Sequence, residues 1–148
     1  MIIYDGPGDL FECGVQTVVC PVNTVQVMGK GLALAFKQRV PGLEAFYKDQ
    51  YPSPNAILKL AVFDVDSERK VLLFPTKQDW RQPGRLDMIH ANLVQLANRY
   101  TEWGIMSLGI PLLGCGVDTG QLDWLAQVKP IVYQFLDPCD LPVKIMHG

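Results

Sequence analysis

Residues 15–37, VQTVVCPVNTVQVMGKGLALAFK, decide the fold of this chain. The first eight of them are mostly apolar and β-branched, which predicts a buried strand over 15–22. A loop follows, and the apolar run from Gly31 onward predicts a helix over 31–39. Gly29 and Gly31 let a ligand approach the backbone closely, and the unpaired amides at a helix start favour an anion. This strand, loop and helix predict a site for a phosphate-bearing ligand.

A second segment of strand, loop and helix lies nearer the carboxyl terminus. Residues 106–113 predict a buried strand, and residues 122–136 predict a helix that is interrupted or bent near Pro130. Between them stands the glycine-rich loop 114–120, GCGVDTG. Two such segments in one small chain predict a binding site for an anionic ligand, with one loop on each side of the ligand.

Two familiar phosphate-binding motifs do not fit the first loop. A Walker A motif needs glycine where Thr24 stands and serine or threonine where Gly31 stands. A dinucleotide-binding G-x-G-x-x-G motif needs a third glycine where Leu34 stands. The ligand therefore has to be inferred from other residues.

The remaining segments alternate between strand and helix signals. Residues 85–102 have the 3.6-residue period of an amphipathic helix. The other predicted elements are a helix over 43–50, a hairpin of strands 58–64 and 70–74, and a closing strand over 143–146. This alternation predicts an α/β domain with a mixed, largely parallel sheet between helices and a ligand site at the carboxyl ends of the strands.

The composition fits one globular domain over residues 1–148, with 49% hydrophobic and 19% charged residues. No apolar run approaches the ~18 residues of a membrane span, and the net charge of −2 argues against a general nucleic-acid coat protein. The N-terminus has no features of a secretion signal, and the four cysteines are too widely spaced for a zinc site or a disulfide framework. We therefore expect a cytoplasmic protein with reduced thiols and with neither metal nor cofactor.

A third polar cluster, 75–81 (PTKQDWR), ends the predicted strand 70–74. With the two loops, this cluster resembles the macrodomain family, in its DarG antitoxin branch and the related terminal ADP-ribose protein glycohydrolases. The matching stretches, which cover nearly the whole chain, are Gly8-Asp9-Leu10, 21–37, 75–81, Gly114-Cys115-Gly116 and Leu122-Asp123-Trp124. The resemblance implies a three-layer α/β/α sandwich that binds ADP-ribose and hydrolyses ADP-ribosyl bonds, for DarG those on thymidine in DNA.

The resemblance also implies partners. ADP-ribose and ADP-ribosylated single-stranded DNA are expected, and a membrane is not. DarG-type antitoxins carry a further domain that engages the toxin, whereas this sequence ends at Gly148. A toxin partner is therefore not carried over.

A set of ADP-ribose contacts is implied by the same resemblance. They are Asp9, Leu10, Asn23, Val27, Met28, Gly29, Lys30, Gly31, Leu32, Gly114, Cys115, Gly116 and Val117. Asp9 is expected to accept from the adenine amino group, or else to cap a turn. Asn23 is expected to hold the distal ribose hydroxyls or a water, or else to shape a turn. Lys30 is either a phosphate contact or a solvated lysine, and Cys115 is expected to be a small buried filler.

Lys77 and an acidic residue of the second loop carry the chemistry that the resemblance implies. Lys77 would attack the anomeric carbon of the distal ribose or assist its opening. Taken alone, its residue type favours binding of phosphate or DNA by charge, and the resemblance favours catalysis. The second loop is two residues longer than the family pattern. Counting from the glycines makes Asp118 the acid/base, and counting back from Trp124 makes Asp123 a helix-start residue. We assign the acid/base role to Asp118.

Trp80, Arg81 and Arg85 flank Lys77 and are predicted to face DNA, since an aromatic ring stacks on a base and guanidinium groups hold backbone phosphates. The alternative is a Trp80 packed in the local core beside solvated arginines. The same loops would also serve three other functions. These are hydrolysis of glutamate-linked ADP-ribose on proteins, removal of phosphate from ADP-ribose 1″-phosphate, and non-enzymatic reading of ADP-ribose.

Overall fold

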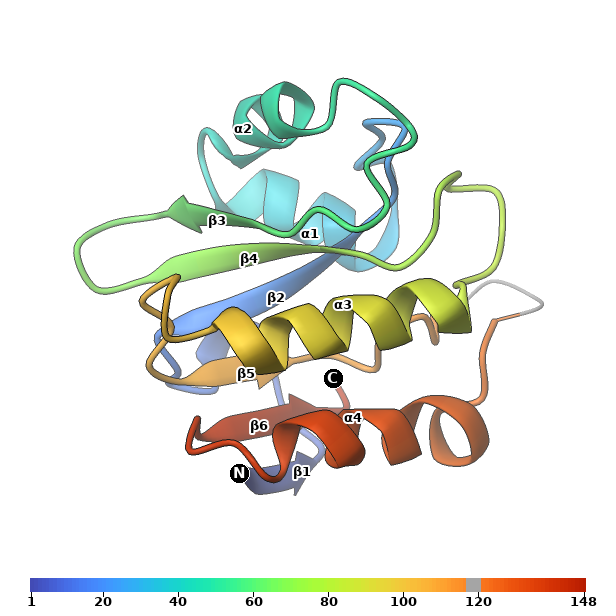
Figure 1. Ribbon diagram of the computed structural model, residues 1–148. Helices are drawn as coiled ribbons and strands as arrows, with labels where there is room; N and C mark the ends of the chain where they lie inside the picture. Colours follow the sequence, from blue (N-terminus) through green and yellow to red (C-terminus); the bar gives the residue numbers. More distant parts are fainter. Residues whose placement is uncertain (117–120) are drawn as a thin grey trace.

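The computed structural model describes residues 1–116 and 121–148. Within these residues a six-stranded sheet lies between two pairs of helices (Figure 1). The strands are β1 (Ile2–Gly6), β2 (Thr17–Val22), β3 (Ala61–Asp64), β4 (Lys70–Pro75), β5 (Leu108–Ile110) and β6 (Val143–Met146). The helices are α1 (Gly31–Arg39), α2 (Leu43–Gln50), α3 (Leu86–Arg99) and α4 (Lys129–Leu136), with a 3₁₀ helix η1 (Leu10–Glu12) and a π-helical turn η2 (Trp124–Val128).

The strand order is β1-β6-β5-β2-β4-β3. Every adjacent pair is parallel except β3 and β4, which form an antiparallel hairpin. The mixed, largely parallel sheet predicted from the sequence is confirmed. Because β6, β5, β2 and β4 run parallel side by side, their carboxyl ends meet at one edge of the sheet, where ligands bind in folds of this class.

Both faces of the sheet are buried, α1 and α2 covering one and α3 and α4 the other (Figure 1). Side chains alternate between the faces along each strand. In β2, Val19 packs toward α3 and α4, whereas Cys20 packs toward α1 and α2. Leu72 and Leu73 of β4 repeat this division. Strands buried on both faces therefore appear in the sequence as continuous apolar runs.

Two predicted strands were too long. The strand predicted over 58–64 begins only at Ala61, because hydrogen-bonded turns, such as that from the Lys59 amide to the Ala56 carbonyl, precede it. The strand predicted over 106–113 shortens to β5, because Pro111 has no amide to donate to a ladder. Leu113 is fully buried without belonging to a strand.

The helices predicted over 31–39 and 43–50 are confirmed with the same bounds, and the two longer helices are confirmed with shorter ends. The prediction over 85–102 corresponds to α3, whose predicted apolar face is its buried one. Near Pro130 the helix changes from π to α type without a gap, since η2 ends at Val128 and α4 begins at Lys129. Pro130 lies in the first turn of α4, where its fixed φ suits the start of an α-helix.

Candidate functional site

A cavity of about 640 Å³ opens at the carboxyl ends of β2, β4, β5 and β6. Its walls come from the loop between β2 and α1, the loop after β4 and the loop after β5, with the residues that end β6 and follow it closing one end. Adjacent strands lie about 4.8 Å apart, so a ligand that reaches from β4 across β2 and β5 to β6 spans about 14 Å. The cavity therefore suits a ligand as long as a nucleotide sugar.

The amino terminus of α1 opens onto this cavity, and residues 29–33 line it. The first helical hydrogen bond runs from the Leu34 amide to the Lys30 carbonyl, so the amides of residues 31–33 come before the intrahelical ladder. Gly31 has a φ of 61°, a backbone conformation that favours glycine. These amides and the helix dipole together attract an anion such as a diphosphate.

Asn23 lines the cavity, but most hydrogen-bonding atoms of its side chain are used within the protein. Its Oδ1 accepts from the Val25 amide at 3.0 Å and from the Tyr47 hydroxyl at 2.8 Å. Its Nδ2 donates to the Val27 carbonyl at 2.8 Å. At most one amide proton of Asn23 remains for a ligand, so its contribution to the turn is larger than the sequence indicates.

The opposite wall contains Gly114, Cys115 and Gly116. Gly114 has a φ of 72°, and Gly84 packs so closely that a Cβ added to it would lie 2.8 Å from the Gly114 Cα. Burial, with a smaller contribution from the charge of Asp123, raises the pKa of the Cys115 thiol to about 11. A thiol that stays protonated is a poor nucleophile, which agrees with the predicted role of a filler.

Lys77 lies on the cavity wall between two anchored neighbours. On one side, the Thr76 amide donates to the Val22 carbonyl at 3.0 Å. On the other, the Gln78 carbonyl accepts from the Thr24 amide at 3.0 Å. Because both flanks are tied to β2 and the loop after it, the backbone of Lys77 has a fixed place beside the anion-facing loop.

Trp80 lines the same cavity and is 39% exposed, which contradicts the alternative of a core tryptophan. The Lys30 ammonium and the Arg81 guanidinium each lie 5.7 Å from the centre of its ring. Arg81 also forms two hydrogen bonds with Asp79, and these lower the pKa of Asp79 to about 2. The aromatic ring is thus accessible and flanked by cations, and Asp79 pairs with the guanidinium of Arg81.

The far end of the cavity is lined by Met146, His147 and Gly148. His147 Nε2 and Asp5 Oδ1 share a hydrogen bond of 2.5 Å, and the Tyr133 hydroxyl donates to Asp5 at 2.6 Å. Burial raises the pKa of Asp5, but the hydrogen bonds from Tyr133, His147 and Lys129 outweigh burial and hold this pKa below its usual value. An ionised Asp5 therefore fixes the His147 ring at this wall.

The lowered pKa of Asp5 makes its contribution to stability depend on pH. This contribution is present above the unfolded-state pKa of about 3.9 and is lost as the pH falls through the lower folded-state value. We expect Asp5→Asn to lower the melting temperature at pH 7, with a gap to the wild type that narrows below about pH 4. Thermal melts between pH 7 and pH 3 measure this gap. A gap that is independent of pH would contradict the assignment.

Most of the predicted ADP-ribose contacts line the cavity: Asn23, Val27, Gly29, Lys30, Gly31, Leu32, Gly114, Cys115 and Gly116. Three others are elsewhere. The Asp9 carboxylate accepts from the Phe11 amide at 2.8 Å and caps η1, which is the alternative role given to it. Leu10 and Met28 are core residues with 5% and 2% exposure, so their side chains support the site from behind.

The acidic candidates of the second loop have separate outcomes. Asp123 is the N-cap of η2 and accepts from the Ala126 amide at 3.1 Å, as expected of a helix-start residue. Val117 and Asp118 lie outside the described residues.

Arg85, predicted to face DNA, forms hydrogen bonds of 3.1 and 2.7 Å with Asp87.

The cavity also has walls that sequence reasoning missed. They include Pro21, Val22, Thr76, Pro111, Leu112, Gln121, Met146 and His147. Most of these residues end a strand or directly follow one. The rule that parallel strands end at a common edge was the available signal, and applying it to every predicted strand would have found them.

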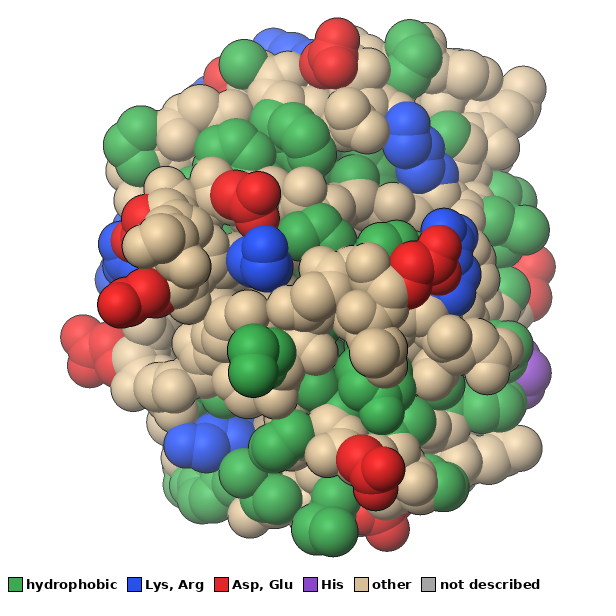
Figure 2. Space-filling view, turned by 60° about the vertical axis from the view of Figure 1, so that its left-hand side comes forward, with side chains coloured by type: hydrophobic (Ala, Val, Ile, Leu, Met, Phe, Trp, Pro, Cys, Tyr) green, Lys and Arg blue, Asp and Glu red, His purple; other side chains and the backbone are tan. Residues whose placement is uncertain are grey.

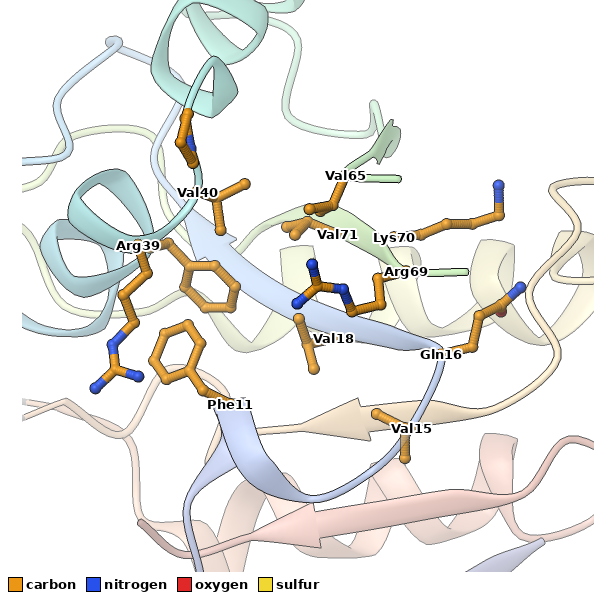
Figure 3. Close-up of a pocket in the computed structure, with 12 residues that line it drawn as sticks. Phe11, Val15, Gln16, Val18, Arg39, Val40, Val65, Arg69, Lys70 and Val71 are labelled. Atoms are coloured by element: carbon orange, nitrogen blue, oxygen red, sulfur yellow. The ribbon is translucent and has the colours of Figure 1, made fainter. Parts of the chain in front are cut away.

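A second hollow of about 460 Å³ lies at the opposite, amino-terminal ends of β2 and β4 (Figure 3). Its floor is apolar, with Val18 and Val71 among its residues. Arg69 and Lys70 at its rim are paired with Asp66 and Asp64 at 2.7 and 2.6 Å. It offers apolar surface, these two ion pairs and Arg39, whose guanidinium lies 4.4 Å from the centre of the Phe11 ring. The predicted site residues are not among those that line it.

Charged side chains of both signs lie on the surface (Figure 2). Figure 2 shows basic and acidic side chains interspersed over one face. Among residues 1–116 and 121–148, no group of three His, Cys, Asp or Glu side chains is placed to hold a metal ion. In the same part of the chain, every helix is too short or too polar to cross a membrane.

Comparisons with known proteins agree with this geometry. No protein-family model matches the chain. The macrodomain of Thermus aquaticus DarG superposes with a TM-score of 0.90 at 32% identity, over 100% of this chain and 99% of that one. Thermosipho africanus DarTG in complex with ADP-ribose superposes with a TM-score of 0.84 at 31% identity, over 94% of this chain and 39% of that one.

A curated relative named DNA ADP-ribosyl glycohydrolase, from Mycobacterium tuberculosis, is 39% identical over 98% of this chain. The chain spans 42% of the length of that relative. The similarity therefore covers nearly all of this chain and less than half of the relative.

Proposed function

The chain belongs to the macrodomain family of DarG proteins, and on that premise we propose that it binds ADP-ribose and removes it from thymidine in DNA by ADP-ribosyl hydrolysis. The observation that carries the proposal is Lys77, anchored on the wall of a cavity whose two long sides are the predicted glycine loops. A similar structure that contains ADP-ribose and a relative named as a DNA ADP-ribosyl glycohydrolase support it.

The position of Lys77 at one end of the cavity indicates which way round ADP-ribose binds. A diphosphate against the amino terminus of α1 leaves one end of ADP-ribose near β4, where Lys77 lies, and the other near β6. The distal ribose belongs at Lys77, since its anomeric carbon carries the bond to be broken. The adenine end then lies toward His147.

Lys77 acts as a nucleophile in this proposal. Its unprotonated Nζ bonds to the anomeric carbon as the bond to the base breaks, and the base leaves with the electron pair and takes up a proton. Water then hydrolyses the adduct and frees both ADP-ribose and the lysine. Asp118 is the proposed acid/base for that second step. An ordinary lysine is only about 0.04% neutral at pH 7, so the site has to favour the neutral amine.

Substrate choice is tested by comparing linkages side by side. The protein is incubated with a single-stranded oligonucleotide carrying ADP-ribose on thymidine, with a glutamate-linked ADP-ribosyl peptide, and with ADP-ribose 1″-phosphate. We expect free ADP-ribose from the oligonucleotide, released faster than from the peptide. Preferential release from the peptide would assign the protein to carboxylate-linked substrates, and release of inorganic phosphate would make it a phosphatase.

The rim of Trp80, Arg81 and Arg85 is the proposed contact with single-stranded DNA. Activity on the oligonucleotide should then fall with rising salt more steeply than ADP-ribose affinity does, by about 0.7 in logarithmic slope for each phosphate contacted. Arg85→Ala, at a rim residue that does not line the cavity, should lower activity on the oligonucleotide while leaving ADP-ribose affinity within a few fold. Equal salt slopes for the two measurements would leave the rim without a role.

A cytoplasmic location is part of the proposal. Its support is that Cys13, Cys20, Cys115 and Cys139 are all free thiols, as is usual for proteins in a reducing compartment.

A further inference from the structure

We propose that Gln26 is a positioning residue that holds the anion-facing loop, residues 27–31, in its binding conformation. The inference deepens the proposed function, on which it rests, because it explains how that loop is kept ready for a diphosphate. Gln26 is not itself among the residues that line the cavity, and its effect on a ligand is exerted through Val27 and the residues after it.

The backbone of Gln26 is unusual for its residue type. Its φ is 67°, and among the described residues it is the one non-glycine residue with a positive φ. A side chain disfavours this left-handed conformation, so the surrounding contacts have to maintain it. Such residues are commonly found where a binding loop must keep one shape.

The side chain of Gln26 supplies the maintaining contacts. Its Nε2 donates to the Lys48 carbonyl at 3.0 Å and to the Tyr51 carbonyl at 2.8 Å. These carbonyls lie at the carboxyl end of α2, where backbone acceptors have no partner inside the helix. Both protons of the amide group are thereby used, so the side chain ties the loop to a rigid element.

The same helix holds the loop at a second point. The Tyr47 hydroxyl, in the last turn of α2, shares its proton between the Asn23 carbonyl, at 2.7 Å, and the Asn23 Oδ1, at 2.8 Å. Tyr47 is fully buried, so this contact is shielded from water. α2 thus holds both Asn23 and Gln26, and we call these contacts the brace. The next residue, Val27, lines the cavity.

A braced loop changes binding more than it changes folding. Amides that already point at the anion lose little freedom when the ligand arrives, whereas a released loop has to be ordered at the expense of affinity. Replacing Gln26 with glycine separates the two effects. Glycine adopts the left-handed backbone without strain, which offsets part of the loss of the two hydrogen bonds, but it leaves the loop free to move.

The experiment measures ADP-ribose affinity by calorimetry and melting temperature for Gln26→Gly, Gln26→Ala and the control Gln50→Ala. Gln50 is the last residue of α2, and its side chain bonds only to Asp49 among the contacts resolved for it, at 3.5 Å. We expect Gln26→Gly to bind about tenfold more weakly with a melting temperature close to that of the wild type. Gln26→Ala should lose both affinity and melting temperature, and Gln50→Ala should lose neither.

Two outcomes overturn the inference. One is a Gln26→Gly variant that binds ADP-ribose within twofold of the wild type, and the other is an affinity that falls only in step with the melting temperature. If the wild type itself does not bind ADP-ribose, the proposed function fails instead. The brace is then still tested by hydrogen exchange of amides 23–30 in the ligand-free protein, which should be faster in Gln26→Gly than in Gln50→Ala and would contradict the brace if equal.

Discussion

Lys77→Ala should reduce release of ADP-ribose from a thymidine-linked oligonucleotide by about a thousandfold or more, while ADP-ribose affinity stays within a few fold. The reason is that a nucleophile acts on the transition state, whereas the bound product is held by the loops and the amino terminus of α1. Single-turnover release and calorimetry, made on the same preparation, measure the two quantities. Lys77 is the residue on which this separation depends.

The matched variant for this test is Lys77→Arg. Arginine keeps the positive charge but is not deprotonated in proteins, so it cannot act as an amine nucleophile. A nucleophilic role predicts that Lys77→Arg is as inactive as Lys77→Ala. Substantial activity in Lys77→Arg, or equal losses of affinity and activity in Lys77→Ala, would make the lysine a phosphate clamp.

Gly29→Val should weaken ADP-ribose binding by about a hundredfold, or ~2.7 kcal/mol. Among the residues that the structure describes, a Cβ at Gly29 would meet only the Val27 Cγ1, at 3.3 Å, so the chain can accommodate it with a small shift. The branched side chain would then occupy the cavity where the diphosphate is expected. Calorimetry measures the loss, and an unchanged melting temperature shows that the fold is intact.

Gly29→Ala provides the graded control. Its single methyl group fills less of the cavity and should cost less affinity than valine. If both variants bind ADP-ribose like the wild type, the ligand does not pass over this loop. The diphosphate site would then have to lie elsewhere in the cavity.

The fold was predictable where the sequence has strong local signals. Strand β2, its loop and α1 have nearly the predicted bounds, because a strand buried on both faces leaves an unbroken apolar run. The ends of β3 and β5 were less predictable. Apolar residues continue past both, and only the hydrogen-bonded turns before Ala61 and the missing amide of Pro111 end the strands.

The loops of the site were predictable from the sequence, whereas the contacts between residues that are distant in the sequence were not. Residues 29–32 and Lys77 line the cavity because they lie in the segments that come after the neighbouring parallel strands β2 and β4. Asp5 and His147 lie at opposite ends of the sequence, and their contact depends on the pairing of β1 with β6. No local pattern encodes that pairing. Likewise, the brace of Gln26 on α2 depends on a backbone conformation that its residue type does not indicate.

The central claim is that this cavity removes ADP-ribose from a DNA base with the chain's own side chains. The most direct test incubates the wild type, in excess chelator, with a single-stranded oligonucleotide ADP-ribosylated on one thymidine, and follows both products by mass spectrometry. We predict free ADP-ribose and the unmodified oligonucleotide in equal amounts. The claim would be contradicted if the protein binds free ADP-ribose by calorimetry but the oligonucleotide keeps its ADP-ribose. The protein would then be a non-enzymatic reader of ADP-ribose.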